Sequence, residues 1–288
     1  MRPALERSPV VGAHATDAAI AAQARACRSG NTIRLPGMRV TDGAERVVQV
    51  LDALGGAHDG LGVSDVAREL RVHRSTASRL LGTLAASGMV ERDHLSLHYR
   101  LGARMVGLAA TAVARLPVVS QARPELEHLS AATSETANLA ILDRFHVVYV
   151  DQVTPAETVV MASWVGRRSP VHASSSGKAM LAFGDGRARE AVLRRRLEPL
   201  TERTITDPDS LRAALDEVRR RGYASSMGEL EDGLITVAAP VLVDGKAVAA
   251  VSTSGPAYRV PARDMPVLGR RVMEAAAAVG HRMAGRSS

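Results

Sequence analysis

Residues 60–84 read GLGVSDVARELRVHRSTASRLLGTL, and this stretch decides the architecture of the first part of the chain. Two segments with apolar residues at helical spacing lie on either side of a short turn at residues 71–73. Ser64 stands just before the first apolar residues, where a hydroxyl suits the N-cap of a helix. The stretch therefore predicts two short helices joined by a tight turn.

The second of these helices is predicted over residues 75–87, with Gly88 as its C-cap. Apolar side chains recur on its inner face at Ala77, Leu80, Leu81 and Leu84. The opposite face is short, polar and centred on Arg79, and Gly82 adds no bulk to it. One side of this helix is therefore expected to be buried and the other to offer hydrogen-bonding groups.

The flanking segments complete a recognisable unit. Upstream, apolar residues between Val47 and Leu54 recur at helical spacing until Gly55-Gly56. Downstream, residues 89–101 alternate in a way that predicts a small hairpin. Three helices followed by a hairpin predict a winged helix-turn-helix over residues 40–101, which suits the major groove of a DNA duplex.

Arg79 is the best candidate for reading a base, because its planar fork matches the O6/N7 edge of guanine. Hydroxyls and arginines around the two helices and the hairpin are candidates for phosphate contacts. They are Ser64, Arg68, Arg71, Arg74, Ser75, Thr76, Ser78, Thr83, Arg92 and Arg100. The alternative is a three-helix module that binds another protein and leaves this polar face in solvent.

Net charge does not decide between these two interpretations. The 288 residues carry a net charge of +7, yet residues 40–101 hold seven basic and eight acidic residues. The surplus lies in residues 1–39, with six against two, and in residues 102–288, with twenty-four against twenty. The DNA interpretation therefore depends on where the arginines stand and not on their total.

Composition excludes several other classes. Aromatic residues make up only 2%, too few for a protein that stacks single-stranded bases on aromatic platforms. The single cysteine, Cys27, excludes a disulfide framework and a cysteine-rich metal site. No apolar run approaches the roughly 18 residues that span a bilayer. We expect a cytoplasmic protein without a membrane partner.

The rest of the chain divides into a tail, a linker and a second domain. Residues 1–39 are predicted to be a disordered tail, or an upstream extension if translation starts at Met38. Residues 102–117 predict a connecting helix that Pro117 closes, and 118–284 a second domain. Helices are expected over 124–132, 176–183, 187–197, 208–221 and 264–283, and strands over 137–142, 147–153, 158–163, 235–243 and 247–254. This order of elements predicts an α+β domain.

Several spaced motifs resemble one known family. The residues GLGVSDVA at 60–67, STASRLLGTL at 75–84 and YRLG at 99–102 are similar to the DNA-binding domain of the IclR family of bacterial transcriptional regulators. In the second half, HASSSGKA at 172–179, RTITD at 203–207, VAAPV at 237–241 and STSGP at 252–256 resemble that family's C-terminal signatures. The likeness spans about residues 40–284.

The resemblance implies a winged helix-turn-helix joined by a linker helix to a GAF-like α/β effector-binding domain. It also implies a homodimer or homotetramer on a palindromic double-stranded operator. Such a regulator controls a catabolic operon, with repression as the favoured sign, and a small carboxylate or aromatic metabolite changes its affinity for DNA.

The resemblance further implies an effector pocket lined mostly by hydroxyls. Matching positions here are Met161, Ser175, Ser176, Ser226, Thr236, Ser252 and Ser254. Ser226 and Thr236 stand where relatives that bind small keto acids often carry Asp and Cys, so this chain departs from that chemistry. The alternative is that these hydroxyls only satisfy backbone groups in a β-rich core.

An enzyme is the rival class, and few residues favour it. Ser175 and Lys178 have the S-x-x-K spacing of a nucleophile motif, but its companion motifs are missing from the sequence. The histidines lack metal-ligand spacing, and we expect His172 to be structural. Trp164 is expected to line the pocket or to pack beneath its loop, and Arg167 and Arg168 to bind an acidic ligand, a second subunit or solvent. We therefore expect no catalytic residue, metal or cofactor.

Overall fold

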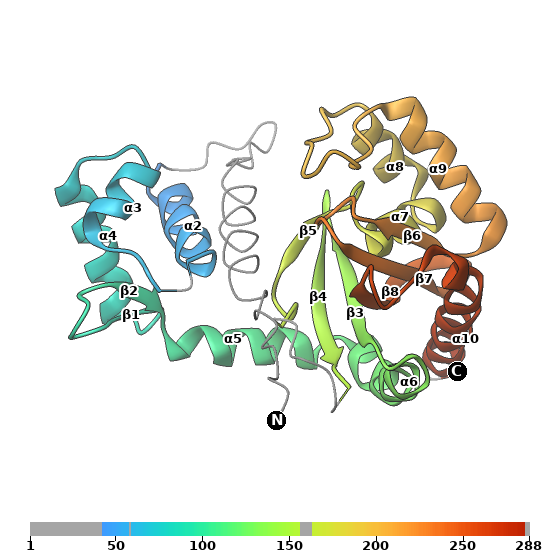
Figure 1. Cartoon of the computed structure of the whole chain (residues 1–288). Coiled ribbons are helices and arrows are strands. Elements are labelled where there is room, and N and C mark those ends of the chain that lie inside the picture. Colours follow the sequence, from blue (N-terminus) through green and yellow to red (C-terminus); the bar gives the residue numbers. More distant parts are fainter. Residues whose placement is uncertain (1–41, 58, 156–162, 286–288) are drawn as a thin grey trace, which may run out of the picture. The chain divides into compact units, whose positions relative to one another are not determined.

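The computed structural model describes residues 42–57, 59–155 and 163–285, and the chain divides into two compact units between Thr111 and Ala112 (Figure 1). The expected tail, Met161 and most of the strand expected over 158–163 lie outside the described residues. Each unit is therefore described by itself.

The first unit is a winged helix-turn-helix, as the sequence predicts. Its helices are α2 (Asp42–Gly55), α3 (Val63–Glu69) and α4 (Arg74–Ala86), and strands β1 (Val90–Arg92) and β2 (Tyr99–Leu101) pair antiparallel as the wing. One apolar cluster joins all five elements, with Val50, Leu54, Val66, Ala67, Ala77, Leu81, Leu84, Val90 and Tyr99 buried. Leu80 is only partly buried against this cluster.

The start of α3 differs from the prediction, because Gly62 and not Ser64 is the N-cap. The carboxylate of Asp65 accepts a hydrogen bond from the Gly62 amide at 3.2 Å. This acceptor at the third helical position lets the helix begin two residues earlier than the Ser64 hydroxyl would. Ser64 is consequently exposed within the first turn of α3.

The end of α4 lies one residue before the predicted one, because Ser87 and not Gly88 is the C-cap. Gly88 follows Ser87 with a φ of 73°. The amides of Gly88 and Met89 donate to the carbonyls of Ala85 and Leu84, each at 3.0 Å. This is a Schellman motif, in which the left-handed residue is preferably glycine.

Two helices follow where the sequence predicts a linker and a shorter helix. Helix α5 (Ala103–Ala114) has no fully buried residue, and α6 (Pro117–Thr133) begins with Pro117 at a first-turn position. The expected helix over 124–132 is therefore too short, because Pro124 lies inside α6 and does not start it. Its missing N–H removes one helical hydrogen bond, but α6 continues because Val118, Ala122, Leu126 and Leu129 are buried in the second core.

Among the described residues, no single helix is long and apolar enough to cross a membrane. Helices α5 and α6 pass that test of length and composition only as a pair, which is bent by 88°.

The second unit contains a six-stranded antiparallel sheet. Its strands are β3 (Thr136–Asp143), β4 (His146–Val153), β5 (Arg168–Pro170), β6 (Ala224–Met227), β7 (Leu234–Val243) and β8 (Lys246–Pro256), in the order β5-β4-β3-β8-β7-β6. The sequence analysis missed β5 and β6. These are the two edge strands, and their three or four residues are too few to show a periodic pattern.

Helices cover both faces of this sheet (Figure 1). Helices α6 and α10 (Met265–Ala284), the latter preceded by a short 3₁₀ turn at Ala262–Asp264, pack on one face. Helices α7 (Ser175–Phe183), α8 (Gly186–Leu193) and α9 (Pro208–Arg221) belong to the other. Helix α8 ends four residues before the predicted end, although Leu197 is still buried.

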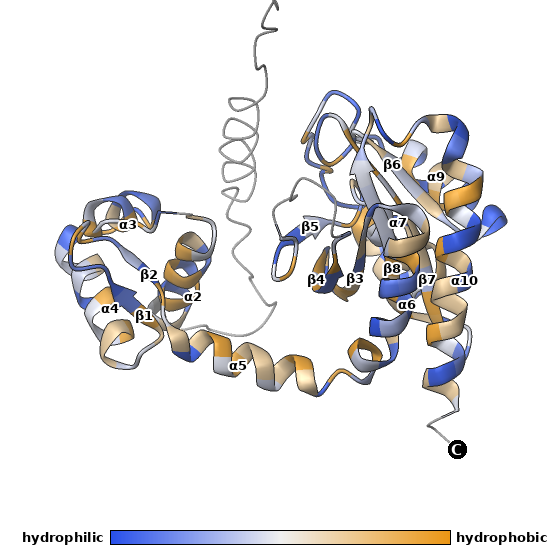
Figure 2. Ribbon diagram, turned by 60° about the horizontal axis from the view of Figure 1, so that its bottom comes forward, coloured by the Kyte–Doolittle hydropathy of each residue, from blue (hydrophilic) through white to orange (hydrophobic). Residues whose placement is uncertain are grey.

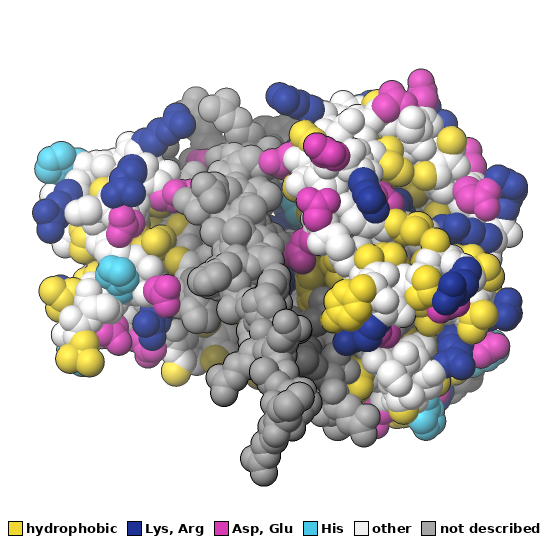
Figure 3. Space-filling model, in the orientation of Figure 1, with side chains coloured by type: hydrophobic (Ala, Val, Ile, Leu, Met, Phe, Trp, Pro, Cys, Tyr) yellow, Lys and Arg dark blue, Asp and Glu magenta, His cyan; other side chains and the backbone are white. Residues whose placement is uncertain are grey.

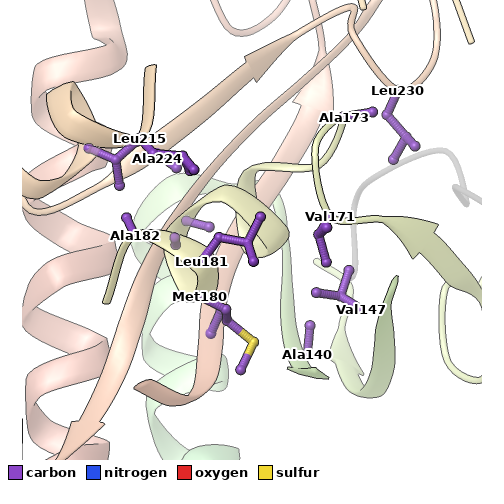
Figure 4. Close-up of a cluster of buried hydrophobic side chains, with 14 of the residues drawn as sticks. Ala140, Val147, Val171, Ala173, Met180, Leu181, Ala182, Leu215, Ala224 and Leu230 are labelled. Atoms are coloured by element: carbon purple, nitrogen blue, oxygen red, sulfur yellow. The ribbon is translucent and has the colours of Figure 1, made fainter. Parts of the chain in front are cut away.

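The core beneath α7 is built from both sheet and helices. Figure 4 shows Met180 and Leu181 of α7 on the side of Ala140 and Val147, and Ala182 on the side of Leu215 and Ala224. Gly177 lets the start of α7 approach the preceding loop, since an added Cβ would lie 2.3 Å from the Val171 Cα. The start of α7 is thus held firmly against this face of the sheet.

Candidate functional site

The outer face of α4 presents the predicted DNA-contacting side chains. Thr76 is half-buried. The others are exposed, namely Arg74, Ser75, Ser78, Arg79 and Thr83. The Thr83 hydroxyl bonds the Arg79 carbonyl at 3.0 Å, and the Ser75 hydroxyl lies 2.8 Å from Nδ1 of His73. Arg79 makes no ion pair with any described residue, so its guanidinium is available to a ligand.

The turn between α3 and α4 presents two further arginines. Arg71 is exposed and has a φ of 53°, and the Val72 amide donates to the Ala67 carbonyl at 3.0 Å. The turn is thus a Schellman motif with arginine in the left-handed position that glycine prefers. Arg68 forms an exposed ion pair with Asp65 at 3.0 Å, which leaves its guanidinium only partly engaged.

The wing adds exposed Arg92 and Arg100. Its tip is ordered by Asp93, whose Oδ1 accepts from the Leu95 amide at 2.9 Å and the Ser96 amide at 2.7 Å. Hydrogen bonds from Ser96 hold the pKa of Asp93 below its usual value. Figure 3 shows basic and acidic side chains interspersed over this unit, in agreement with its nearly neutral sum.

In the second unit, a row of hydroxyls crosses the sheet on the face that α7 covers. Ser226 of β6 lies opposite Thr236 of β7, which lies opposite Ser254 of β8, which lies opposite Thr136 of β3. All four side chains are buried. These four hydroxyls, in register across four strands, form a polar strip on this face, here called the hydroxyl strip.

A second row runs beside the first. Ser252 of β8 lies opposite Asn138 of β3, and Asn138 lies opposite Gln152 of β4. Ser252 and Ser254 share a face because side chains repeat every two residues along a strand. Thr253 points to the opposite face, where its hydroxyl lies 3.5 Å from that of Thr133 on α6.

The first turn of α7 meets this strip. Ser174 is the N-cap, accepting from the Gly177 amide at 3.2 Å, and the Ser175 hydroxyl lies 2.7 Å from that of Thr236. The Ser226 hydroxyl donates to the Ala173 carbonyl at 2.9 Å. The structure therefore brings Ser175, Ser176, Ser226, Thr236, Ser252 and Ser254 to one layer between α7 and the sheet.

These contacts divide the predicted effector residues into two kinds. Ser175, Ser226 and Thr236 already bond other protein groups, which is the alternative that the sequence left open. The Ser176 hydroxyl is buried and has no hydrogen-bond partner among the described residues. Such a group costs free energy unless a ligand or water satisfies it.

Thr136, Asn138 and Tyr149 also lie in this layer, although the sequence does not predict them as site residues. Burial raises the pKa of Tyr149 to about 12, although the nearby hydroxyls of Ser169 and Ser176 act in the opposite direction. The polar residues at 136 and 138 alternate with apolar ones, which in isolation resembles a strand with one face in solvent.

The basic side chains near α7 are already engaged. Nζ of Lys178 lies 2.6 Å and 2.7 Å from the two carboxylate oxygens of Glu229, and Lys178 is 3% exposed. Burial lowers the pKa of Lys178, whereas Glu229 raises it. Lys178 is thus held by Glu229 and is not positioned as a base for Ser175, so the S-x-x-K spacing gains no support.

Trp164 is buried against Tyr149. Its ring meets that of Tyr149 edge-on, with centroids 5.4 Å apart, and the Arg167 guanidinium lies 4.4 Å from its centroid. Arg167 is also 3.8 Å from Glu231, and Arg168 pairs with Asp143 at 2.6 Å. These contacts occupy both arginines that were candidates for an acidic ligand.

His172 behaves as the structural residue expected. Its Nε2 lies 3.0 Å from the Glu198 carbonyl, and burial lowers its pKa below the usual 6.5. No group of three or more potential metal ligands occurs within the described residues. A surface hollow of about 410 Å³ lies away from the hydroxyl strip, lined by Arg195, Arg196, Leu197, Pro199, Thr206 and Pro208.

The winged helix-turn-helix with its exposed arginines and hydroxyls defines a DNA-binding protein that carries a separate α/β domain. Two family models match the chain, the IclR helix-turn-helix domain over residues 43–94 and the C-terminal domain of the bacterial transcriptional regulator IclR over residues 110–281. The chain belongs to the IclR family of bacterial transcriptional regulators.

Similar proteins agree with this assignment. The chain is 35% identical to the transcriptional regulator BhcR of Paracoccus denitrificans, over 87% of this chain and 89% of the relative. It is 31% identical to the transcriptional repressor AllR of Escherichia coli, over 74% and 79%. It also resembles the structure of an IclR homolog from Microbacterium hydrocarbonoxydans in complex with 4-hydroxybenzoate, with a TM-score of 0.71 and 30% identity over 85% of this chain and all of that one.

Proposed function

We propose that this regulator binds a palindromic operator through the outer face of α4. In this proposal Arg79 reads a guanine in the major groove. Phosphates are contacted by Ser64, Arg68, Arg71, Arg74, Ser75, Thr76, Ser78, Thr83, Arg92 and Arg100. The observation that carries the proposal is the exposure of Arg79 on a polar helix face whose opposite side is buried in the core.

A second copy of the chain is expected to supply the other half-site. Helix α5 supports this part of the proposal, because its single charge is Arg104 and no residue in it is fully buried. Val106 is 71% exposed and Leu108 48% exposed. Figure 2 shows that α5 is largely hydrophobic. Such a helix suits a homodimer or homotetramer better than solvent.

The C-terminal domain is proposed to bind a small carboxylate or aromatic effector on the α7 face of the sheet. Ser175, Ser176, Ser226, Thr236, Ser252 and Ser254 are its proposed contacts, together with Met161 outside the described residues. Support comes from the buried, unpartnered Ser176 hydroxyl and from the hydroxyl strip beside it. The relative that binds 4-hydroxybenzoate makes an aromatic carboxylate a reasonable first candidate.

The regulator is proposed to repress a catabolic operon in the cytoplasm and to act by binding alone, without enzymatic turnover. The name of AllR as a repressor supports the sign of regulation. The engaged side chains of Ser175 and Lys178 support the absence of a nucleophile at this site.

Binding of the full-length protein to duplexes that tile the DNA upstream of its own gene tests the proposal. One duplex should bind specifically and compete against excess unrelated DNA, with log Kd linear in log salt. Equal affinity for all duplexes would contradict an operator-reading function. Failure to bind any duplex would favour the protein-interaction module instead.

A further inference from the structure

The side-chain amide of Asn138 is buried, and one of its two polar ends has no hydrogen-bond partner among the described residues. Asn138 lies on β3 and is 2% exposed. Its Nδ2 donates to the Ser254 hydroxyl at 3.1 Å, and that hydroxyl lies 3.5 Å from the Thr136 carbonyl. Its Oδ1 is buried without a hydrogen-bond partner among the described residues.

This hydrogen-bond chain favours one direction of the amide. The Ser254 hydroxyl has one proton, and donating it to the Thr136 carbonyl leaves its oxygen to accept from Asn138. Nδ2 therefore faces Ser254, and the acceptor Oδ1 is the end left over. A buried acceptor without a donor is unfavourable, so a ligand that supplies the missing donor is favoured.

The neighbouring side chain on β4 is not free to supply that donor. Gln152 lies opposite Asn138 on β4, but its Nε2 donates to the Thr154 hydroxyl at 2.9 Å and its Oε1 accepts from the Trp164 amide at 2.7 Å. The hydroxyl strip connects the site to α7, because the Ser175 hydroxyl contacts Thr236, which lies opposite Ser254. Asn138 therefore belongs to the same polar layer as the first turn of α7.

The α7 end of the layer has the opposite character. It offers the hydroxyl of Ser176, which is 1% exposed, lies near Tyr149 and forms no hydrogen bond with the described residues. This hydroxyl lies at the helix end whose dipole favours negative charge. Lys178 and Arg167 are both engaged by glutamates. An anion would therefore be bound at the start of α7 by neutral hydrogen-bond donors. At the other end of the layer, Oδ1 of Asn138 would accept a hydrogen bond from a ligand hydroxyl.

We propose that the effector is a hydroxycarboxylate, whose carboxylate lies at the first turn of α7 and whose hydroxyl donates to Oδ1 of Asn138. This inference rests on the proposed effector function of the α7 face. A keto acid with a carbonyl in place of that hydroxyl has no proton to donate and leaves Oδ1 unpaired. Asn138 is thus a specificity-determining residue that selects the hydroxy form over the keto form.

Matched pairs of ligands test this assignment on the full-length protein. Suitable pairs are lactate and pyruvate, 2-hydroxybutyrate and 2-oxobutyrate, and mandelate and phenylglyoxylate. Binding is measured by calorimetry and by the fluorescence of Trp164, the only tryptophan. A site built to bond a hydroxyl discriminates strongly against an analogue without it, so we expect at least about a tenfold preference for the hydroxy member of one pair.

Substitution of Asn138 provides the second arm. Asn138→Leu should lower the affinity for the hydroxy acid by about tenfold or more and change that for the keto acid little. Thr253→Val is the matched control. Thr253 lies on β8 opposite Ala137, and its buried hydroxyl points to the other face of the sheet. If Asn138→Leu does not fold, the wild-type comparison of paired ligands still decides the question.

Three results would overturn the assignment. They are equal or tighter binding of the keto acids, an equal loss of both ligands in Asn138→Leu, and no binding of any hydroxy acid. Failure of the underlying function looks different, because a hydroxy acid would then bind selectively through Asn138 without changing the affinity for the operator.

Discussion

Arg79 illustrates how a single residue is prepared for a partner. Its side chain is exposed at the centre of the polar face of α4 and forms no ion pair with the described residues. The buried Ala77 and Leu81 on the other side of the helix fix the direction in which this face points. The fork of a guanidinium in that position suits the major-groove edge of guanine.

Arg79→Ala is therefore expected to weaken operator binding by about 1–3 kcal/mol and to relax the preference at one base position. Arg74→Ala should instead weaken binding to all sequences alike. It should also reduce the slope of log Kd against log salt by about one unit, because one phosphate contact is lost. The measurement is affinity for a set of operators with single base changes. Arg187→Ala, an exposed arginine in α8, is the control. If Arg79→Ala keeps the full base preference, another face reads the DNA.

The buried His172 makes the free energy of unfolding depend on pH. Burial lowers its pKa below 6.5 in the folded protein, so below pH 6.5 the unfolded chain takes up a proton that the folded chain refuses. Stability is therefore lost as the pH falls below about 6.5. Burial shifts His146 in the same direction, so His172 accounts for only part of this loss.

Urea denaturation between pH 7 and pH 5 measures this effect. The midpoint should fall for the wild type and fall less for His172→Gln, whose amide retains a donor for the Glu198 carbonyl. His128→Gln, at an exposed position on α6, should follow the wild type. An identical fall in His172→Gln and the wild type would contradict the account.

At the scale of elements, the turn between α3 and α4 combines a local cost with a proposed function. Arg71 occupies the left-handed conformation that glycine prefers, at a cost of about 1–2 kcal/mol. The rest of the turn is an ordinary Schellman motif. The cost is consistent with a side chain retained for contact with DNA.

Arg71→Gly should change the free energy of unfolding by less than about 1 kcal/mol, because relief of strain offsets the greater freedom of the unfolded chain. Operator binding should weaken, and the slope of log Kd against log salt should fall by about one unit. Arg71→Lys keeps the charge and should restore most of the slope. Unchanged DNA affinity in Arg71→Gly would show that this side chain makes no phosphate contact.

Elements with a strong periodic pattern could be predicted, and those decided by tertiary contacts could not. The buried spacing of α4 and the turn at Asp244-Gly245 follow from the sequence, and both turn residues have positive φ as a tight hairpin requires. The extent of α6 depends on packing that overrides Pro124. Strands β5 and β6 exist because they pair with longer neighbours.

The same limit applies to the candidate site. The hydroxyls at Ser175, Ser226, Thr236 and Ser254 were found through a resemblance, and the structure places them in one layer. Asn138 was missed, because only the helix packed over β3 distinguishes a polar residue in a buried layer from one in solvent. The sequence shows that residue 138 is Asn, but only the fold shows that a helix buries it.

For the molecule as a whole, α5 supports the proposal that two copies of the chain associate. A helix of twelve residues with one charge and no fully buried residue exposes apolar surface that a second copy would remove from water. Two winged helices in one assembly would also match the two halves of a palindrome.

Val106→Glu and Leu108→Glu, made separately, should convert the wild-type oligomer to monomers and weaken operator binding. Light scattering coupled to size exclusion gives the mass. Val267→Glu, at an exposed apolar position on α10, is the control and should leave the mass unchanged. A monomeric wild type, or oligomers that survive both α5 substitutions, would exclude α5 as the interface.

We propose that a small ligand on the α7 face changes the affinity of the first unit for DNA. The most direct measurement is the Kd of the full-length protein for its own operator, with and without the hydroxycarboxylate that binds it most tightly. We expect a change of at least about fivefold, which is the lower end of typical coupling between sites. An operator Kd that stays the same while the ligand saturates the protein would contradict it.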